Sequence, residues 1–442
     1  MSPHLNGGRL EEQLDDAKPL YTKGEAIAEA NRCLYCQDAP CIQACPTGID
    51  IPTFIRKIGT ENVRGSARTI LSANLLGDSC ARVCPVEVLC VGSCVYNAWD
   101  RYPPIAIGRL QRYATETVMT RGESAALLSK APANGKRVAC VGAGPASLAC
   151  AGYLALEGAS VTLFEKRELA GGLNTTGVAP YKMHAEASLR EVAFVRSLGV
   201  EIKTGVEVGR GVTAEQLVKD YDAVFLGVGL GDDTQLGVPG QDGAGVEGAV
   251  AWIERMKLQR DFTLTGVTNA VVIGGGNTAI DAARELARLR VPSVSMLYRR
   301  TAADMSGYAH EMEHARIDGV VLVERAVPKS FERDAAGKLV AITLADGRRI
   351  ACELALVAIG QGKLAALAAG FKGIEVDEKG RLKADPKTGA TGHAKVFAGG
   401  DAVRGGDLVV TAVQDGKRAA RAIARAIGIA VREGAPMNAG HV

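Results

Sequence analysis

The chain has 442 residues, about three times an average domain, so two or three domains are expected. Its hydrophobic content of 47%, charged content of 23% and net charge of +3 are ordinary for a globular protein, and they give no reason to expect nucleic acid or a charged membrane as a partner. The acidic N-terminus lacks the apolar segment of a secretion signal, and no apolar run is long enough to span a membrane. We therefore expect a cytoplasmic protein.

The first 120 or so residues are predicted to be helical and to contain most of the cysteines. Helical patterns cover residues 25–32, 52–58 and 65–71. All but three of the 11 cysteines lie between Cys33 and Cys94, and such a cluster in a reducing compartment is typical of metal binding. The three others, in strand and helix patterns, are predicted to be core residues: Cys140, Cys150 and Cys352.

The clustered cysteines form two runs, each containing a Cys-Pro pair. The runs are Cys33-x2-Cys36-x4-Cys41-x3-Cys45-Pro46 and Cys80-x3-Cys84-Pro85-x4-Cys90-x3-Cys94. Compact loops of this kind, with a Cys-Pro that reaches a second centre, are typical of two-cluster ferredoxins. Structural zinc sites more often show two Cys-x2-Cys pairs, so zinc is the weaker alternative. A pair of zinc sites would indicate a non-enzymatic scaffold. Spacing alone does not decide whether Cys80 and Cys84 serve one cluster or compete for one position.

Residues 120–135 show no clear helix or strand pattern and are predicted to form a linker. After them, strands and helices alternate. A strand at 136–141, a helix at 146–156 and a strand at 161–165 predict a parallel sheet. Between the first strand and the helix lies the turn Gly142-Ala143-Gly144-Pro145-Ala146-Ser147, which is typical of dinucleotide binding. Its glycines allow a pyrophosphate to approach the helix N-terminus, and Glu165 is placed to bind ribose hydroxyls.

Two further segments support a flavin module that is bounded at both ends of the chain. Gly171-Gly172-Leu173 follows the first unit, and Phe397-Ala-Gly-Gly-Asp401 follows a strand expected at 395–398. A helix at 413–427 closes the module, and residues from Met437 onward are expected to form a loose tail. The weaker alternative is an ordinary sheet with glycine turns.

A second strand–helix–strand unit, at 270–273, 278–288 and 294–298, carries the turn Gly274-Gly275-Gly276-Asn277-Thr278. Its last strand ends in Arg299 and Arg300, where arginine pairs with a 2′-phosphate, so the motif favours NADP; a solvated strand end is the alternative. Two dinucleotide modules in one chain indicate FAD in one and a nicotinamide in the other, with hydride transfer followed by one-electron steps. Further strands are expected at 320–324, 339–344 and 353–358.

The predicted fold class is α/β, with an N-terminal α-helical double 4Fe-4S domain followed by two Rossmann-like domains. The NAD(P) domain is expected to be inserted in the FAD domain. The predicted segments are 1–125 for the iron–sulfur domain, 135–245 and 363–442 for the two parts of the FAD domain, and 246–362 for the NAD(P) domain.

Together these motifs resemble the N-terminal part of dihydropyrimidine dehydrogenase and its bacterial form, in which that part is a separate subunit. The small subunit of glutamate synthase is a sister family with the same architecture. Gln111 favours the pyrimidine branch, because that family uses a glutamine as a cluster ligand where the sister family has Glu. Ser147 likewise matches the pyrimidine branch, where the sister family has Gly.

The resemblance also implies site residues. One cluster would be held by Cys33, Cys36, Cys41 and Cys94, and the other by Cys45, Cys84, Cys90 and Gln111, which leaves Cys80 free. A helical-surface glutamine is the alternative for Gln111. FAD contacts would fall on Ala143, Gly144, Pro145, Ala146, Ser147, Glu165, Leu173, Lys182, Val208, Gly400, Asp401, Ala402, Val403 and Val409. The nicotinamide cofactor would contact Gly275, Gly276, Asn277, Thr278, Arg299, Arg300, Ala358, Ile359 and Gly360.

The same resemblance implies a partner and a choice of nicotinamide. NADPH-using members carry a further arginine where this chain has Ser306, so we expect NADH, although NADPH remains open. The family's pyrimidine chemistry occurs at FMN in a TIM barrel, for which we see no room here. A PreA-like FMN/Fe-S catalytic chain, in a heterotetramer, is therefore expected to reduce uracil or thymine.

Overall fold

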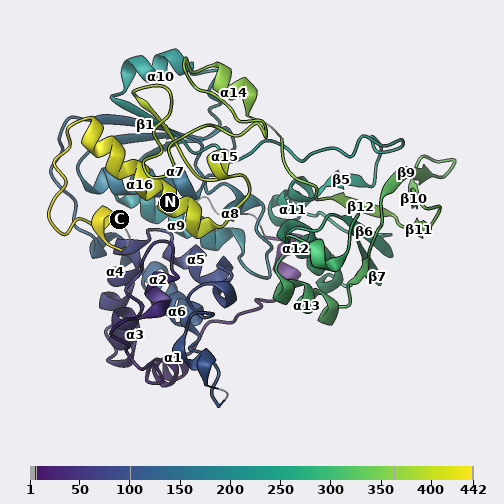
Figure 1. Cartoon of the computed structure of the whole chain (residues 1–442), viewed down its shortest axis with the longest axis horizontal. Helices are drawn as coiled ribbons and strands as arrows, with labels where there is room; N and C mark the ends of the chain where they lie inside the picture. The colour runs from purple at the N-terminus through teal and green to yellow at the C-terminus, as the bar shows by residue number, and fades with distance from the viewer. Residues whose placement is uncertain (1–4, 6, 100, 363, 441–442) are drawn as a thin grey trace.

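The computed structural model describes residues 5, 7–99, 101–362 and 364–440. A helical N-terminal domain, here called the cysteine domain, lies against the first α/β domain, and the second α/β domain extends to the side (Figure 1). Each α/β domain contains a five-stranded sheet. Among the residues that the structure describes, no helix combines the length and apolarity needed to cross a bilayer.

The cysteine domain confirms the predicted helices: the first is shifted by two residues, to 23–30, and the other two are longer by one or two residues at each end. Its elements are η1 (Leu10–Gln13), α1 (Lys23–Ala30), α2 (Pro40–Gln43), α3 (Ile51–Gly59), α4 (Val63–Ala73), α5 (Gly77–Val83), η2 (Val86–Val88), η3 (Val95–Ala98), α6 (Ile107–Thr120) and η4 (Ser124–Leu127). Side-chain caps set several of the starts: Thr22 and Glu25 form a capping box at α1, Asp50 caps α3 and Asn62 caps α4.

The first α/β domain is built on the parallel sheet β13-β4-β1-β2-β3. Its elements are β1 (Arg137–Val141), α7 (Pro145–Leu156), β2 (Ser160–Phe164), α8 (Leu173–Thr176), α9 (Ala185–Ser197), β3 (Glu201–Lys203), α10 (Ala214–Asp220), β4 (Ala223–Leu226), α14 (Ala365–Ala369), β13 (Val396–Ala398), α15 (Asp401–Arg404), α16 (Val409–Ala426) and η6 (Pro436–Asn438). Strand β13 follows the whole second sheet in sequence, so the second domain is inserted in the first. This confirms the predicted fold class.

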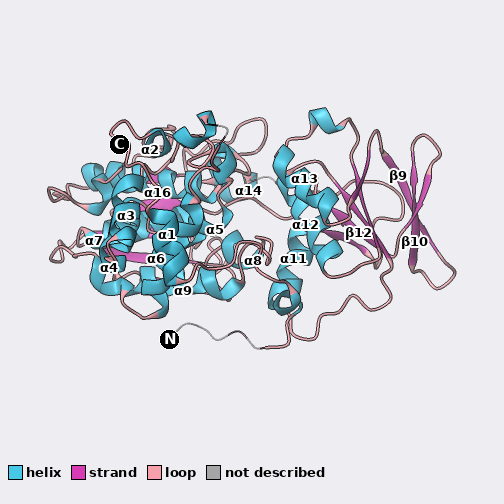
Figure 2. Cartoon of the chain, turned by 90° about the horizontal axis from the view of Figure 1, so that it is seen from below, coloured by secondary structure: helices cyan, strands magenta, loops and turns pink. Residues whose placement is uncertain are grey.

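The inserted domain carries the parallel sheet β5-β12-β6-β7-β8 and the antiparallel sheet β11-β10-β9. Its elements are β5 (Val246–Gly248), α11 (Ala249–Leu258), β6 (Asn269–Ile273), α12 (Asn277–Arg288), β7 (Ser293–Leu297), η5 (Ala302–Asp304), α13 (Ala309–Ile317), β8 (Val321–Val323), β9 (Pro328–Arg333), β10 (Leu339–Leu344), β11 (Arg349–Ala351) and β12 (Leu354–Val357). Helices α11–α13 cover one face of the parallel sheet, and β9–β10 lie on the other side (Figure 2).

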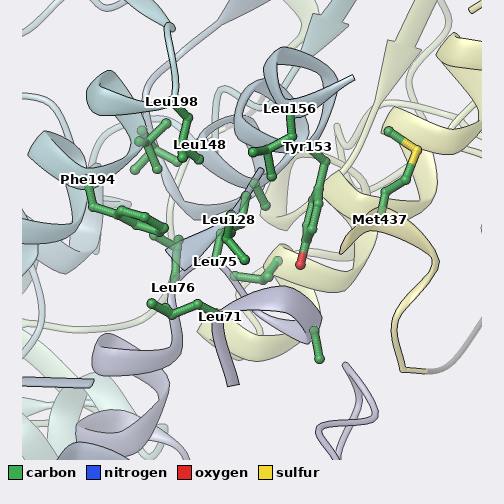
Figure 3. Close-up of a cluster of buried hydrophobic side chains, with 14 of the residues drawn as sticks. Leu71, Leu75, Leu76, Leu128, Leu148, Tyr153, Leu156, Phe194, Leu198 and Met437 are labelled. Atoms are coloured by element: carbon green, nitrogen blue, oxygen red, sulfur yellow. The ribbon is translucent and has the colours of Figure 1, made fainter. Parts of the chain in front are cut away.

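The cysteine domain and the first α/β domain share one hydrophobic core (Figure 3). Leu75 and Leu76 of the cysteine domain pack among Leu148, Tyr153 and Phe194 of the α/β domain. Burial of apolar surface across this boundary stabilises the two domains as one body, because each buried Leu or Phe contributes about 1.5–3 kcal/mol.

Two segments predicted to be loose are partly buried, although the first does join α6 to β1, and residues 441–442 of the second lie outside the described residues. The stretch expected to be a linker buries Leu127 and Leu128 in the shared core, each 8% exposed. The expected tail forms η6 and buries Met437, which is 1% exposed. Neither segment has a hydrophobic period of its own, so their burial depends on partners distant in sequence. The expectation for the outlying cysteines is confirmed, because Cys140, Cys150 and Cys352 are fully buried.

Helix α7 is packed closely on two sides. A side chain at Gly416 of α16 would clash with the carbonyl of Ala146 in α7. On the other side, a Cβ at Gly152 would lie 2.6 Å from Cδ1 of Leu75, a buried residue of the cysteine domain. Glycine at both positions therefore allows the three elements to approach one another.

A buried carboxylate also joins the two domains. Glu191 of α9 accepts hydrogen bonds from the backbone N–H groups of Asp78 (2.8 Å) and Ser79 (3.0 Å) in the first turn of α5. The hydroxyl of Ser79 donates to the same carboxylate. Burial, with Asp78 nearby, raises the pKa of Glu191 to about 8.

Replacing Glu191 by alanine leaves two buried N–H groups without an acceptor, so we expect the free energy of unfolding to fall by about 2 kcal/mol. Glu191→Gln keeps an acceptor. Because the folded-state pKa of about 8 lies above the ordinary value of 4.5, the parent loses stability as pH rises between these values, whereas the glutamine variant does not. Urea unfolding at about pH 6 and pH 8 measures both effects. The prediction is wrong if the free energy of unfolding of Glu191→Gln, minus that of the parent, does not increase with pH.

Candidate functional site

The first dinucleotide turn connects β1 to α7 and is built from backbone. Gly142 has φ +84°, and a Cβ there would lie 2.7 Å from the carbonyl oxygen of Gly227. Helix α7 begins after Gly144 without a side-chain cap, so its first N–H groups remain available. A Cβ at Gly172 would lie 2.7 Å from Cα of Gly144, so the second predicted glycine segment lies against the turn. A helix N-terminus that is open in this way suits a pyrophosphate.

Glu165 follows β2 and is held at the edge of the turn. One carboxylate oxygen accepts from the backbone N–H of Ala143 at 2.8 Å, and the other accepts from Arg167 at 2.9 Å. Two backbone donors fix the carboxylate in place. Its predicted task, accepting hydrogen bonds from ribose hydroxyls, requires this fixed position.

The loop after β13 brings a second acidic side chain to the same place. Asp415 of α16 accepts from the N–H of Gly400 at 3.1 Å and pairs with Arg404 at 2.6 Å, which holds the loop against the helix. Asp401 accepts from the N–H of Asp407 at 3.2 Å, and burial raises the pKa of Asp401 to about 7. Sequence reasoning identified Asp401 but missed the contacts of Arg404 and Asp415.

These elements surround a cavity of about 540 Å³ that both α/β domains line. Its size and its mixture of glycine backbone and polar side chains suit a dinucleotide. The predicted residues that line it are Ala143, Gly144, Pro145, Ala146, Glu165, Leu173, Lys182, Asn277, Thr278, Gly400, Asp401 and Val409. The segment 227–233, which follows β4, also lines the cavity and was missed, although Gly227, Gly229 and Gly231 are a signal of close backbone approach.

Other predicted residues do not line this cavity. They are Ser147, Val208, Gly275, Gly276, Arg299, Arg300, Ala358, Ile359, Gly360, Ala402 and Val403. Ser147 is buried beneath the turn, with its Oγ 3.5 Å from the carbonyl oxygens of Val141 and Gly227. Val208 packs against a neighbouring hydrophobic cluster.

The second turn repeats the construction of the first. A side chain at Gly274 would clash with the carbonyl of Ala358, and one at Gly275 would clash with the ring of Tyr298. Helix α12 begins after Gly276 without a side-chain cap, so this turn also suits a pyrophosphate. Arg299 and Arg300 lie exposed directly after Tyr298.

A charged group in the cavity connects the two α/β domains. The ammonium of Lys182 lies 2.7 Å from Asp281 of α12 and 2.7 Å from Glu311 of α13. The backbone N–H of Tyr308, which also lines the cavity, donates a hydrogen bond to Oδ1 of Asn277 at 3.0 Å. Lys182 was predicted as a flavin contact, whereas Glu311 and Tyr308 carried no motif that could identify them.

The cysteines implied for the first cluster meet at one place. Cys33, Cys36, Cys41 and Cys94 line a single pocket whose remaining wall is apolar and includes Tyr96. Burial raises the pKa of Cys41 to about 12, so this side chain is a thiol at neutral pH unless a metal cation stabilises the thiolate. Four thiols in one apolar pocket fit an iron–sulfur cluster.

The second group lies beside the first. The thiol of Cys84 hydrogen-bonds with Cys80, and its pKa is raised well above the ordinary value by that bond, by burial and by Cys90 and Cys45. The side-chain amide of Asn74 donates to Sγ of Cys80 at 3.2 Å. Cys80 therefore lies among the predicted ligands and has a hydrogen-bond donor of its own.

Gln111 lies on α6 and is buried against α5. Its Nε2 donates to the carbonyl of Gly77 at 2.7 Å, which leaves Oε1 for another partner. Among the described residues, no group of three or more His, Cys, Asp or Glu is arranged to hold a single metal ion. A four-iron cluster is wider than one ion, so this finding concerns zinc-like sites only.

The cysteine domain and the dinucleotide cavity meet at Cys84. Its two neighbours in sequence, Val83 and Pro85, line the cavity together with the flavin-turn residues. The spacing analysis did not anticipate this contact, because it depends on how α5 packs against the α/β domain.

Comparisons with known proteins agree with this arrangement. Residues 10–123 match the family model described as dihydropyrimidine dehydrogenase domain II, 4Fe-4S cluster. Residues 136–416 match the model of the pyridine nucleotide-disulphide oxidoreductases. The boundary between the matches falls in the stretch that joins the cysteine domain to β1.

Curated relatives extend over nearly the whole chain. The NADPH glutamate synthase small chain of Escherichia coli is 34% identical over 438 residues, with 91% of this chain and 92% of that protein covered. The NAD-dependent dihydropyrimidine dehydrogenase subunit PreT of Escherichia coli is 35% identical over 412 residues, with 93% and 96% covered. These identities do not separate the two branches.

Solved structures match the α/β part of the fold. Thioredoxin reductase of T. acidophilum is 21% identical with a TM-score of 0.53, covering 65% of this chain and 96% of that one. Mycobacterium tuberculosis FprA in complex with NADPH is 19% identical with a TM-score of 0.53, covering 66% and 85%. At these identities the likeness concerns the fold alone.

Gly142 offers a direct test of the first turn. In Gly142→Ala the new Cβ meets the carbonyl of Gly227, so we expect protein that retains much less flavin after purification. Gly135→Ala is the matched control, because Gly135 also has a positive φ (+76°) but has nothing within 4 Å of its Cβ position. Flavin absorbance per chain measures the result. Equal flavin content in the two variants would show that the turn does not bind it.

Proposed function

The chain belongs to the pyridine nucleotide-disulphide oxidoreductase family, and on that premise we propose that it is the electron-input subunit of a dihydropyrimidine dehydrogenase. It would oxidise NADH at FAD and pass electrons through two 4Fe-4S clusters to a PreA-like FMN/Fe-S chain. That partner would interconvert uracil or thymine and their 5,6-dihydro forms, in a cytoplasmic heterotetramer. The relative PreT supports this assignment, because it is a subunit of an NAD-dependent dihydropyrimidine dehydrogenase.

One observation carries the proposed electron path: the neighbours of Cys84 line the dinucleotide cavity. Electron transfer between two centres requires that they lie close together. A cluster bound at Cys84 would lie beside a flavin bound in the cavity. The pKa of Cys90 is raised by burial and by both Cys45 and Cys41, and the latter belongs to the other group of cysteines. The two cysteine groups are thus close enough to influence each other electrostatically.

We assign the ligands as the resemblance implies. Cys33, Cys36, Cys41 and Cys94 would hold one cluster, while Cys45, Cys84, Cys90 and Gln111 would hold the other. The hydrogen bond from Gln111 Nε2 to Gly77 supports this choice, because it orients the amide and leaves the oxygen available. The side-chain amide of Asn74 donates a hydrogen bond to Sγ of Cys80. Cys80 would keep this partner if it remained a free thiol, as the assignment requires.

The residues of the cavity have separable tasks. The open N-terminus of α7 and Glu165 would hold the pyrophosphate and ribose of FAD, and the turn before α12 would hold the nicotinamide dinucleotide. When bound, FAD accepts a hydride and releases electrons singly. Lys182, held by carboxylates of the inserted domain, is a cation at the place where the two cofactors would meet.

We propose NADH as the donor. Arg299 and Arg300 are exposed after β7, and they alone would favour a 2′-phosphate. A neutral residue lies beside the second turn: Oγ of Ser306 is 3.5 Å from the Cβ position of Gly276. At this position, the NADPH-using members of the family that the chain resembles carry a third arginine, which this chain lacks.

The second candidate is an input subunit of the glutamate synthase type. The glutamate synthase small chains of Escherichia coli and Halomonas elongata are as similar to this chain as PreT is, at 34% and 35% identity. In that case the cavity and clusters would work in the same way, and only the partner and final acceptor would differ. Gln111 and Ser147 remain the residues that favour the pyrimidine branch.

Substitution of cysteines tests the ligand assignment. We expect anaerobically prepared Cys84→Ser protein to lose about half of its iron and acid-labile sulfide, because one of two clusters loses a thiolate. Cys80→Ser is the control, since it removes a neighbouring buried thiol that is not assigned as a ligand. Iron and sulfide analysis per flavin gives the readout. If Cys80→Ser loses iron while Cys84→Ser retains it, the assignment is wrong.

A coupled assay tests the proposed acceptor. The purified chain is combined with a PreA-like chain, and NADH oxidation is followed with and without uracil. We expect uracil-dependent oxidation, with dihydrouracil as the product. The comparison arm contains the glutamate synthase large chain with glutamine and 2-oxoglutarate. Glutamate formation without any reduction of uracil would replace the first candidate with the second.

A further inference from the structure

Large apolar side chains are exposed in the cysteine domain around the first cysteine pocket. Leu34 is 47% exposed, Trp99 49% and Tyr102 60%. Single exposed apolar residues are common, but a contiguous group on a soluble protein marks an interaction surface. Among the described residues of the first α/β domain, no large hydrophobic side chain reaches comparable exposure.

These side chains form one group. The ring of Tyr96 lies 5.2 Å from that of Trp99 and 6.2 Å from that of Tyr102, both in edge-on arrangements. Leu34 and Tyr96 line the same pocket as the cysteines. We call Leu34, Tyr96, Trp99 and Tyr102 the aromatic patch. Aromatic residues are enriched where proteins bind one another, because they bury a large area at little entropic cost.

The aromatic patch adjoins the first cysteine pocket, and none of its residues lines the dinucleotide cavity. The cavity is lined instead by Val83 and Pro85, which flank Cys84 of the second cysteine group. Leu34 lies between the ligands Cys33 and Cys36 in sequence and is exposed. A chain docked on the patch would therefore approach the first cluster within a side chain's length of its ligands.

The edge of the aromatic patch is positively charged. The guanidinium of Arg32 lies 5.5 Å from the ring centroid of Tyr96, and that of Arg56 lies 4.8 Å from the centroid of Tyr35, the residue after Leu34. Arg32 pairs with Glu29 at 2.7 Å. Among the described residues, Arg56 makes no ion pair with a carboxylate, so its charge beside Tyr35 is available to a partner.

We propose that the aromatic patch is the docking surface for the partner chain that accepts the electrons, through an apolar face edged by carboxylates. This rests on the proposed function, because the patch is an exit only if the clusters carry electrons. The apolar centre would supply affinity, and the arginines would orient the encounter.

The experiment uses the full-length holoprotein with Trp99→Glu or Tyr102→Glu. Glutamate places a charge in the apolar centre and repels an acidic edge on the partner. Ile317→Glu is the matched control, since Ile317 is an exposed apolar residue (75%) on the inserted domain. The probe is whichever FMN/iron–sulfur chain accepts electrons in the coupled assay. NADH-driven ferricyanide reduction and bleaching of the cluster absorbance are measured without it.

We expect the two patch variants to raise the KM for the partner chain by about tenfold or more, whereas Ile317→Glu leaves it unchanged. Ferricyanide reduction and cluster bleaching should stay at parent levels in all three. If both patch variants transfer electrons to the partner chain as well as the parent does, the docking proposal is wrong but the proposed function stands. The same holds if NADH reduces the clusters of the parent protein but the parent passes electrons to neither partner chain. A parent whose clusters NADH does not reduce would overturn the proposed function as well.

Discussion

Helix α7 is packed so closely between the cysteine domain and α16 that side chains at two positions are excluded. Gly416 lies against the carbonyl of Ala146, and Gly152 lies against the buried Leu75. The same helix begins at the first dinucleotide turn, directly after Gly144. One helix therefore contacts the cysteine domain along its side while its N-terminus faces the cavity. Its position determines both sites together.

This packing explains why the loop around Cys84 reaches the cavity. Helix α5, which ends at Val83, is held by Glu191 of the α/β domain at its first turn, and it directly follows Leu75 and Leu76 of the shared apolar core. Close-packed apolar interiors deform little, so the separation between the cavity and Cys84 is insensitive to surface fluctuations. A short and constant separation is what electron transfer between two bound centres requires.

The features that could be predicted from the sequence are those whose cause is local. The turn at Gly142 needs a positive φ and backbone approach, and the cysteine runs need particular spacings, so both were visible in the residues themselves. Leu128 and Met437 were misplaced because their burial depends on a core formed by distant segments. Lys182 was found by resemblance, yet its partners Asp281 and Glu311 belong to the inserted domain and carry no motif.

The two boundaries of the first α/β domain differ in chemistry. Toward the cysteine domain the contacts are mainly apolar side chains such as Leu75 and Phe194. Toward the inserted domain, Ala179 and Tyr181 also pack in an apolar cluster, but here Lys182 adds ion pairs with two carboxylates in the cavity.

Apolar contacts lose their whole stabilisation when they separate, whereas charged groups at a boundary regain water on opening. The apolar core shared with the cysteine domain therefore holds the dinucleotide turn and Cys84 at a constant separation. The charged groups around Lys182 can exchange partners with water or a bound molecule at lower cost.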